Sequence, residues 1–144
     1  MIILDTNVIS EFMRPRPARS VLEWSRTQSL RELATTSISL AEIRHGLARL
    51  SFGRRRRELE ARFNALLSRG FASRVFDFDA AAADAYGDVM VARERAGRRL
   101  EGCDGLIAAI AKSRNLPVAT RNLDDFSGCG IDVISPWNDA SSSL

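Results

Sequence analysis

Short runs of apolar or β-forming residues alternate with amphipathic segments along the whole chain. The runs cover residues 1–4, 33–37, 75–76, 117–120 and 131–134. Between them, apolar residues recur every three or four positions, which is the spacing of a helix with one buried face. Strands that alternate with helices predict an α/β fold in which helices cover a central, mostly parallel sheet. The first run is continuously apolar, so we expect its strand in the interior of that sheet.

Capping and breaking residues locate the helices. Helix starts are expected after residue 17 and near residues 39, 54, 79, 103 and 122. Ser39 and Glu42 have the three-residue spacing of a capping box. Gly53 separates the helix that follows Ser39 from a basic-headed helix ending near Gly70, so these two helices are predicted to form a hairpin.

The chain has 144 residues, which suits one domain. We expect that domain over residues 1–138 and a short, serine-rich polar tail over residues 139–144. Asp5 interrupts the first apolar run too early for a signal peptide, and no segment has the length of a membrane span. We therefore expect a cytoplasmic protein with no membrane partner, in which Cys103 and Cys129 are reduced thiols.

Four acidic residues stand where predicted strands give way to helices. Asp5 follows the first run, Glu42 lies in the first turn of the helix after the second run, and Asp125 lies five residues beyond the fourth run. Asp104 opens the helix that precedes the fourth run. Ligands of open α/β sheets bind outside the carboxyl ends of the strands, where the following helices begin. The sequence therefore predicts an acidic cluster at that edge of the sheet.

Each acid also has a purely structural explanation. Asp and Glu are favoured at helix starts because they cap free N–H groups and suit the helix macrodipole. Glu42 would complete the capping box with Ser39, and Asn122 would cap the turn that contains Asp125. Under this alternative the four acids are caps, and the protein is a non-catalytic module that binds nucleic acid or a protein partner.

Two of the acids favour a metal site over capping alone. Asp104 is in register with the apolar Ile107 and Ala111, and Asp5 ends a strand expected in the interior. A buried carboxylate needs a cation, and neither position has a lysine or arginine beside it. Mg²⁺ or Mn²⁺ would relieve the repulsion, because these hard ions prefer carboxylate and water oxygens.

The charge distribution suits a polyanionic partner. The net charge is +3, but with the four acids set aside 14 acidic residues remain against 21 basic ones, a net +7. A basic body attracts a nucleic acid, and an acidic pocket with a metal ion is the usual means of cleaving it. Candidate nucleic-acid-binding residues are Arg54, Arg55, Arg56 and Arg57 in one run and Arg93, Arg98 and Arg99 in a second. Both runs are equally compatible with a solvated basic face.

Other reaction types fit the residues less well. A metal-free ribonuclease normally needs two proton-transfer groups, and His45 is the one histidine of the chain. A phosphatase with an aspartyl nucleophile would show a second Asp two residues after the first, where this chain has Asn7.

Four segments of the chain form an ordered set: Ile3-Leu4-Asp5-Thr6-Asn7-Val8, Ser39-Leu40-Ala41-Glu42-Ile43-Arg44-His45-Gly46, Asp104-Gly105-Leu106-Ile107-Ala108-Ala109 and Ala119-Thr120-Arg121-Asn122 followed by Asp125-Phe126. Together they resemble the PIN-domain family, and the closest likeness is to its VapC and FitB toxin ribonucleases. The resemblance spans nearly the whole chain. It extends to Ser135-Pro136-Trp137, which resembles the family's Asn-Pro-Trp ending with Ser in place of Asn.

The resemblance implies a PIN-like α/β/α sandwich and an Mg²⁺- or Mn²⁺-dependent endoribonuclease, a hydrolase that acts as the toxin of a type II toxin–antitoxin pair. It also implies an RNA substrate, homodimerisation and neutralisation by an antitoxin encoded beside the toxin, in a binary or higher assembly. Carried over by position, the catalytic and metal-binding residues are Asp5, Glu42, Asp104 and Asp125, with Thr6, Asn7, Thr120 and Asn122 as polar supports. Asp125 is preferred to Asp124 because it directly precedes Phe126, as in the family.

Overall fold

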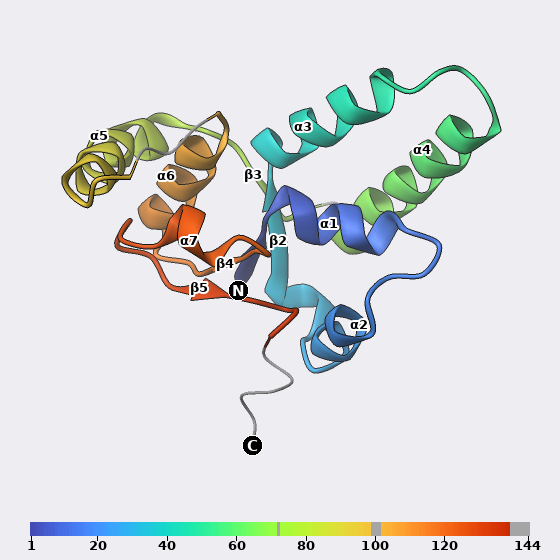
Figure 1. The fold of residues 1–144 in the computed structure, drawn as a ribbon, viewed down its shortest axis with the longest axis horizontal. Helices are drawn as coiled ribbons and strands as arrows, with labels where there is room; N and C mark the ends of the chain where they lie inside the picture. Colours follow the sequence, from blue (N-terminus) through green and yellow to red (C-terminus); the bar gives the residue numbers. More distant parts are fainter. Residues whose placement is uncertain (72, 99–101, 139–144) are drawn as a thin grey trace.

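The computed structural model describes residues 1–71, 73–98 and 102–138, and its five strands form one parallel sheet (Figure 1). The strands are β1 (Ile2–Leu4), β2 (Leu33–Thr36), β3 (Val75–Phe76), β4 (Val118–Ala119) and β5 (Val133–Ile134). They lie in the order β3-β2-β1-β4-β5, and every neighbouring pair is parallel. The predicted α/β class and the parallel sheet are confirmed.

Seven α-helices accompany the strands within the described residues. They are α1 (Thr6–Met13), α2 (Arg19–Arg26), α3 (Ser37–Ala48), α4 (Arg54–Leu66), α5 (Ala80–Arg95), α6 (Asp104–Arg114) and α7 (Leu123–Phe126). A 3₁₀ turn covers Leu30–Glu32, and one π-helical turn, Leu67–Phe71, ends α4. None of these helices has the length and apolar character that a membrane crossing requires.

Helices cover both faces of the sheet, which makes the fold a three-layer sandwich. Successive residues of β1 point to opposite faces, so Ile3 and Leu4 belong to different core clusters and both are fully buried. The cluster around Ile3 takes its helical residues from α5, α6 and α7. Figure 1 shows α5 and α6 packed side by side, away from the predicted hairpin of α3 and α4.

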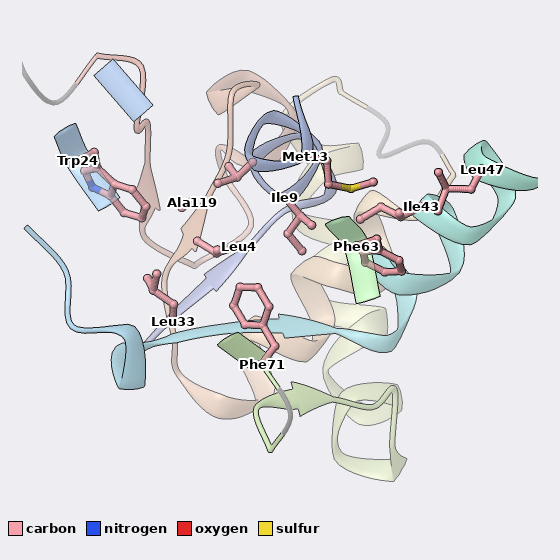
Figure 2. Packing of buried hydrophobic residues seen from close by; sticks show 11 residues of the cluster. Leu4, Ile9, Met13, Trp24, Leu33, Ile43, Leu47, Phe63, Phe71 and Ala119 are labelled. Carbon is pink, nitrogen blue, oxygen red and sulfur yellow. The ribbon is translucent and has the colours of Figure 1, made fainter. Parts of the chain in front are cut away.

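The second cluster joins the sheet to α1 and to the α3–α4 hairpin. Figure 2 shows Phe63 of α4 near Ile43 of α3, with Ile9 of α1 and Leu4 of β1 in the same group. Phe63 is completely buried, so it anchors the hairpin to the sheet.

The strand order fixes where a ligand should bind. From β1 to β3 each new strand is added on one side of its predecessor, and then the chain returns through α5 and α6 to place β4 on the other side of β1. The direction of winding therefore reverses between β1 and β4. Crevices at such a reversal, outside the carboxyl ends of the strands, are the usual ligand sites of open α/β sheets. Asp5 and Thr120 directly follow these two strands.

One predicted helix start is wrong by two residues. The cap of α3 is Thr36, whose hydroxyl accepts a hydrogen bond from the Ser39 N–H at 3.1 Å, so Ser39 is not the capping residue. Because α3 begins at Ser37, Glu42 lies beyond its first turn and makes no capping box. Glu42 is therefore free for another role.

Replacing Thr36 with Ala should lower the free energy of unfolding by about 1 kcal/mol, because α3 loses its side-chain cap. Urea denaturation followed by circular dichroism measures this change. Ser29→Ala is the matched control, since Ser29 stands at the start of the 3₁₀ turn without a side-chain capping bond. An equal loss in both variants would contradict the capping role of Thr36.

Candidate active site

Asp5 is the buried centre of the site. Its side chain stands at the end of β1 and the start of α1, with 4% of the residue exposed. One carboxylate oxygen accepts the Thr6 N–H at 2.7 Å, and the other accepts the Thr120 hydroxyl at 2.8 Å. Burial raises the pKa of Asp5 above its ordinary value, the two hydrogen bonds partly counter this, and the charges of Glu42 and Asp125 raise it further. Asp5 thus caps α1 and also belongs to an acidic group.

Polar residues after β1 and β4 hold Asp5 in place. The side-chain NH₂ of Asn7 donates to the Asp5 carboxylate and to the Thr120 hydroxyl, each at 3.3 Å. The Thr120 hydroxyl also accepts the Asn122 backbone N–H at 3.1 Å, and the side-chain Oδ1 of Asn7 accepts the Arg121 backbone N–H at 3.1 Å. These bonds tie the two strand ends together across the winding reversal. The side chain of Asn122 makes no capping hydrogen bond at the start of α7, which speaks against the purely structural explanation given above for this residue.

The first residue of α1, Thr6, orients the side chain of Glu42. The Thr6 hydroxyl donates to the Glu42 carboxylate at 2.7 Å and lies 3.1 Å from the Ser39 hydroxyl. The second turn of α3 is thereby held against the start of α1. Glu42 makes no ion pair within the part of the chain that the structure describes, so its charge is directed at the pocket.

Asp104 opens α6 and is half-buried. Its pKa is raised to about 7, first by burial and then by the negative charges of Asp5, Asp125 and Glu42, while the Arg93 cation lowers it. The three acids act on Asp104 strongly enough to shift its titration, which places all four in one electrostatic group. A carboxylic acid that titrates near neutral pH can lose its proton to solvent when a cation binds in its place.

The pocket outside the strand ends is shared by three of the four acids. Asp5, Glu42 and Asp104 line a depression of about 520 Å³. Asp125 lines a neighbouring depression of about 430 Å³, and Arg121 and Asn122 line both. Among the described residues, no three Asp, Glu, His or Cys side chains converge tightly enough to form a ready-made metal site. The acids therefore form the walls of an open pocket.

Four further residues line this pocket, and the sequence patterns did not single them out. They are Ser10, Glu11, Arg14 and Arg121. Glu11 is buried and accepts the Ala18 N–H at 2.9 Å and an Arg14 N–H at 3.4 Å, so it fixes the loop after α1. Arg121 stands inside the Thr-Arg-Asn segment that carries the resemblance, which was the one available signal.

The first arginine run is divided between structural and free side chains. Arg54 pairs with Glu58 at 2.9 Å, and Arg56 pairs with Glu60 at 2.8 Å and covers the Phe52 ring. Arg55 and Arg57 are exposed and have no ion pair within the described part of α4.

The second arginine run is corrected at Arg93. This residue is 3% exposed, and its guanidinium donates to the backbone carbonyls of Asp124 and Ser127, so it fastens α7 to α5 and is too buried to bind nucleic acid. Its place on the buried stripe of α5, one turn after Val89, decides its role. Arg98 is exposed and lies 3.8 Å from the Asp124 carboxylate, whereas Arg99 lies outside the described residues.

The histidine and the cysteines lie apart from the proposed chemistry. His45 is exposed on α3 and forms none of the ion pairs among the described residues. Cys103 and Cys129 are unpaired, in agreement with the predicted reduced thiols.

Comparisons with known proteins agree with the site and the fold. The PIN domain family model matches residues 2–128. The VapC ribonuclease Y4jK of Sinorhizobium fredii is 39% identical over 140 residues, which are 97% of this chain and 100% of that protein. Toxin FitB of Neisseria gonorrhoeae is 37% identical over 139 residues, which are 96% of this chain and 100% of that protein.

Solved structures extend the likeness to three dimensions. The crystal structure of FitAcB from Neisseria gonorrhoeae contains a chain that superimposes with a TM-score of 0.87 at 36% identity, covering 95% of this chain and 99% of that one. Fold and sequence therefore match over nearly the full length of both chains. This chain belongs to the PIN-domain family and is similar within it to the VapC and FitB toxins.

Proposed function

We propose that this protein is a divalent-metal-dependent endoribonuclease and the toxin of a type II toxin–antitoxin pair. The observation that carries the proposal is the shared electrostatics of Asp5, Glu42, Asp104 and Asp125 at the winding reversal of the sheet. The relatives named VapC ribonuclease and tRNA(fMet)-specific endonuclease VapC, the latter from Shigella flexneri and 30% identical over 138 residues, supply the reaction class.

The donor set fits Mg²⁺ or Mn²⁺. All four acids offer carboxylate oxygens, which hard divalent ions prefer, and burial together with the charges of the other three acids raises the pKa of Asp104. Mg²⁺ keeps several of its waters and usually takes only one or two protein carboxylates directly. An open pocket with acids along its walls suits such a hydrated ion better than a closed cage.

Each residue then has a distinct task. Asp5 and Asp104 would hold the ion directly, and Glu42 and Asp125 would complete the site or orient its waters. Such an ion lowers the pKa of a bound water and neutralises phosphate charge. Thr120 and Asn7 keep the Asp5 carboxylate oriented toward the pocket, and Thr6 does the same for Glu42.

Cleavage of a labelled, mixed RNA pool by purified, partner-free protein tests this proposal. Reactions contain Mg²⁺, Mn²⁺ or EDTA, and binding of the same RNA is measured in parallel. Cutting that requires the metal would support the enzyme. A folded protein that binds RNA and cuts none of it under any metal would favour the non-catalytic binding module.

The expected partner is an antitoxin that blocks the acidic pocket. A second depression of about 300 Å³ between α1, α3 and α4 shares Thr6, Ser10, Arg14 and Glu42 with the acidic pocket and is otherwise lined mainly by apolar residues. An amphipathic antitoxin helix would lay its apolar face there and extend an arginine or lysine to the acids. The solved FitAB and VapBC complexes are toxin–antitoxin assemblies of this chain's structural neighbours.

Co-expression with the protein encoded beside the toxin tests whether an antitoxin blocks the acidic pocket. The pair should co-purify, and the toxin in the complex should bind Mn²⁺ more weakly than the free toxin. A complex with unchanged metal affinity would contradict a basic residue in the pocket.

The homodimer implied by the family stays a prediction, which light scattering of the purified protein checks.

A further inference from the structure

Two arginines, Arg14 and Arg121, line the acidic pocket. Among the described residues, neither forms an ion pair with Asp5, Glu42, Asp104 or Asp125. Arg14 pairs with Glu11, and Arg121 forms none of these ion pairs. Guanidinium N–H groups of both arginines are therefore available to an incoming anion.

Arg121 is held in a defined position beside the acids. Its backbone N–H donates to the side-chain oxygen of Asn7 at 3.1 Å, and its guanidinium lies over the Trp137 ring, 5.2 Å from the centroid. Stacking on an aromatic ring uses the face of a guanidinium and leaves its N–H groups at the edge free to donate. The exposed guanidinium makes no hydrogen bond within the described residues. This arrangement presents a planar, fork-shaped donor of the kind that binds phosphate oxygens.

Arg14 stands at the other end of α1. Asp5 caps the start of this eight-residue helix and Arg14 caps its end, so the pocket runs along α1 for about 12 Å. Buried Glu11 accepts one N–H of Arg14 at 3.4 Å, while 63% of the arginine side chain is exposed. One bond orients the guanidinium, and its remaining N–H groups face solvent.

We propose that Arg121 and Arg14 bind two different phosphates of the RNA strand, Arg121 next to the acids and Arg14 farther along α1. This inference rests on the proposed function, because it assigns the substrate contacts of that site. Arginine suits the task, since it forms bidentate, charge-assisted hydrogen bonds to phosphate. Arg16, which is exposed next to this loop but does not line the pocket, has no such role.

The salt dependence of RNA binding tests the assignment. A mixed-sequence, single-stranded RNA is titrated with protein between 50 and 200 mM salt, in an Asp104→Asn background that keeps the RNA intact. Each phosphate contact contributes about 0.7 to the slope of log K against log salt, so Arg121→Gln and Arg14→Gln should each lower the slope by about 0.7 and weaken binding about fivefold at 0.1 M salt. Arg16→Gln and Arg95→Gln, which replace exposed arginines outside the pocket, are the controls.

The possible results distinguish a failure of the proposed phosphate contacts from a failure of the proposed nuclease activity. Slopes that fall for Arg121→Gln and Arg14→Gln, and stay within about 0.2 of the parent for the controls, would support the assignment. Equal changes in all four variants, or none in any, would overturn it even if the unmutated protein cuts RNA with metal. If the slopes fall as expected but the unmutated protein cuts no RNA under any metal, the phosphate contacts stand and the nuclease is overturned.

Discussion

Replacement of Asp104 with Asn is expected to reduce metal-dependent RNA cleavage by at least about 100-fold while the protein stays folded and still binds RNA. The change removes one negative charge and one carboxylate but keeps the size of the side chain at the start of α6. Loss of an outer-shell partner of a metal ligand already costs about 10- to 100-fold in activity or metal affinity, so loss of a ligand should cost no less. Initial cleavage rates at saturating Mn²⁺ measure the effect.

Asp84→Asn is the matched control for this experiment. Asp84 is an exposed acid on α5 and takes no part in the described ion pairs or pocket linings, so its loss should leave the cleavage rate unchanged. An Asp104→Asn protein that cuts as fast as the parent would remove Asp104 from the metal site. If Asp84→Asn were as damaging, the loss in the first variant would reflect general charge rather than the pocket.

Without metal, the contribution of Asp104 to stability should fall as the pH rises from about 4 to about 7. The unfolded carboxyl titrates near 3.8 and the folded one at about 7, so the native state binds the proton more tightly. Its stabilising effect is complete below the unfolded pKa and is lost as the pH passes through the folded pKa. Solvent reaches this half-buried group, so we expect a loss of about 2 kcal/mol rather than the full linkage value.

Urea denaturation in EDTA across this pH range gives the free energy of unfolding of the parent and of Asp104→Asn at each pH. The difference between the two curves is the contribution of Asp104. Mg²⁺ or Mn²⁺ should remove the difference near pH 7, since an ion that binds only the folded state stabilises it. A difference that does not vary with pH would contradict the shared electrostatics of the acids.

The sequence was most informative where local chemistry and tertiary structure agree. The continuous apolar run before Asp5 required a strand buried on both faces, and the structure places β1 in the middle of the sheet. Asp79 caps α5 as expected, because an Asp before an alanine-rich stretch has few competing roles. The positions of Asp5, Glu42, Asp104 and Asp125 follow from the same pattern of strand ends and helix starts.

Sequence reasoning failed where a side chain's role depends on distant residues. Arg93 looks like part of a basic run, but its partners are backbone carbonyls about thirty positions away, which no local pattern encodes. Thr36 replaces Ser39 as the cap of α3 because β2 ends where the helix begins, and the Ser39 hydroxyl contacts Thr6 instead. Arg14 and Arg121 enter the pocket only because α1 and β4 lie at the same edge of the sheet.

The pairing of β1 with β4 bears on when the acidic pocket can form. β4 ends at Ala119, and Asp5 gains its Thr120 partner only when that strand has joined β1. These two residues are 115 positions apart in the sequence, so a partly synthesised chain that lacks β4 holds Asp5 without the bond that orients its carboxylate. The pocket is therefore completed by tertiary pairing late in synthesis and not by the local structure around Asp5.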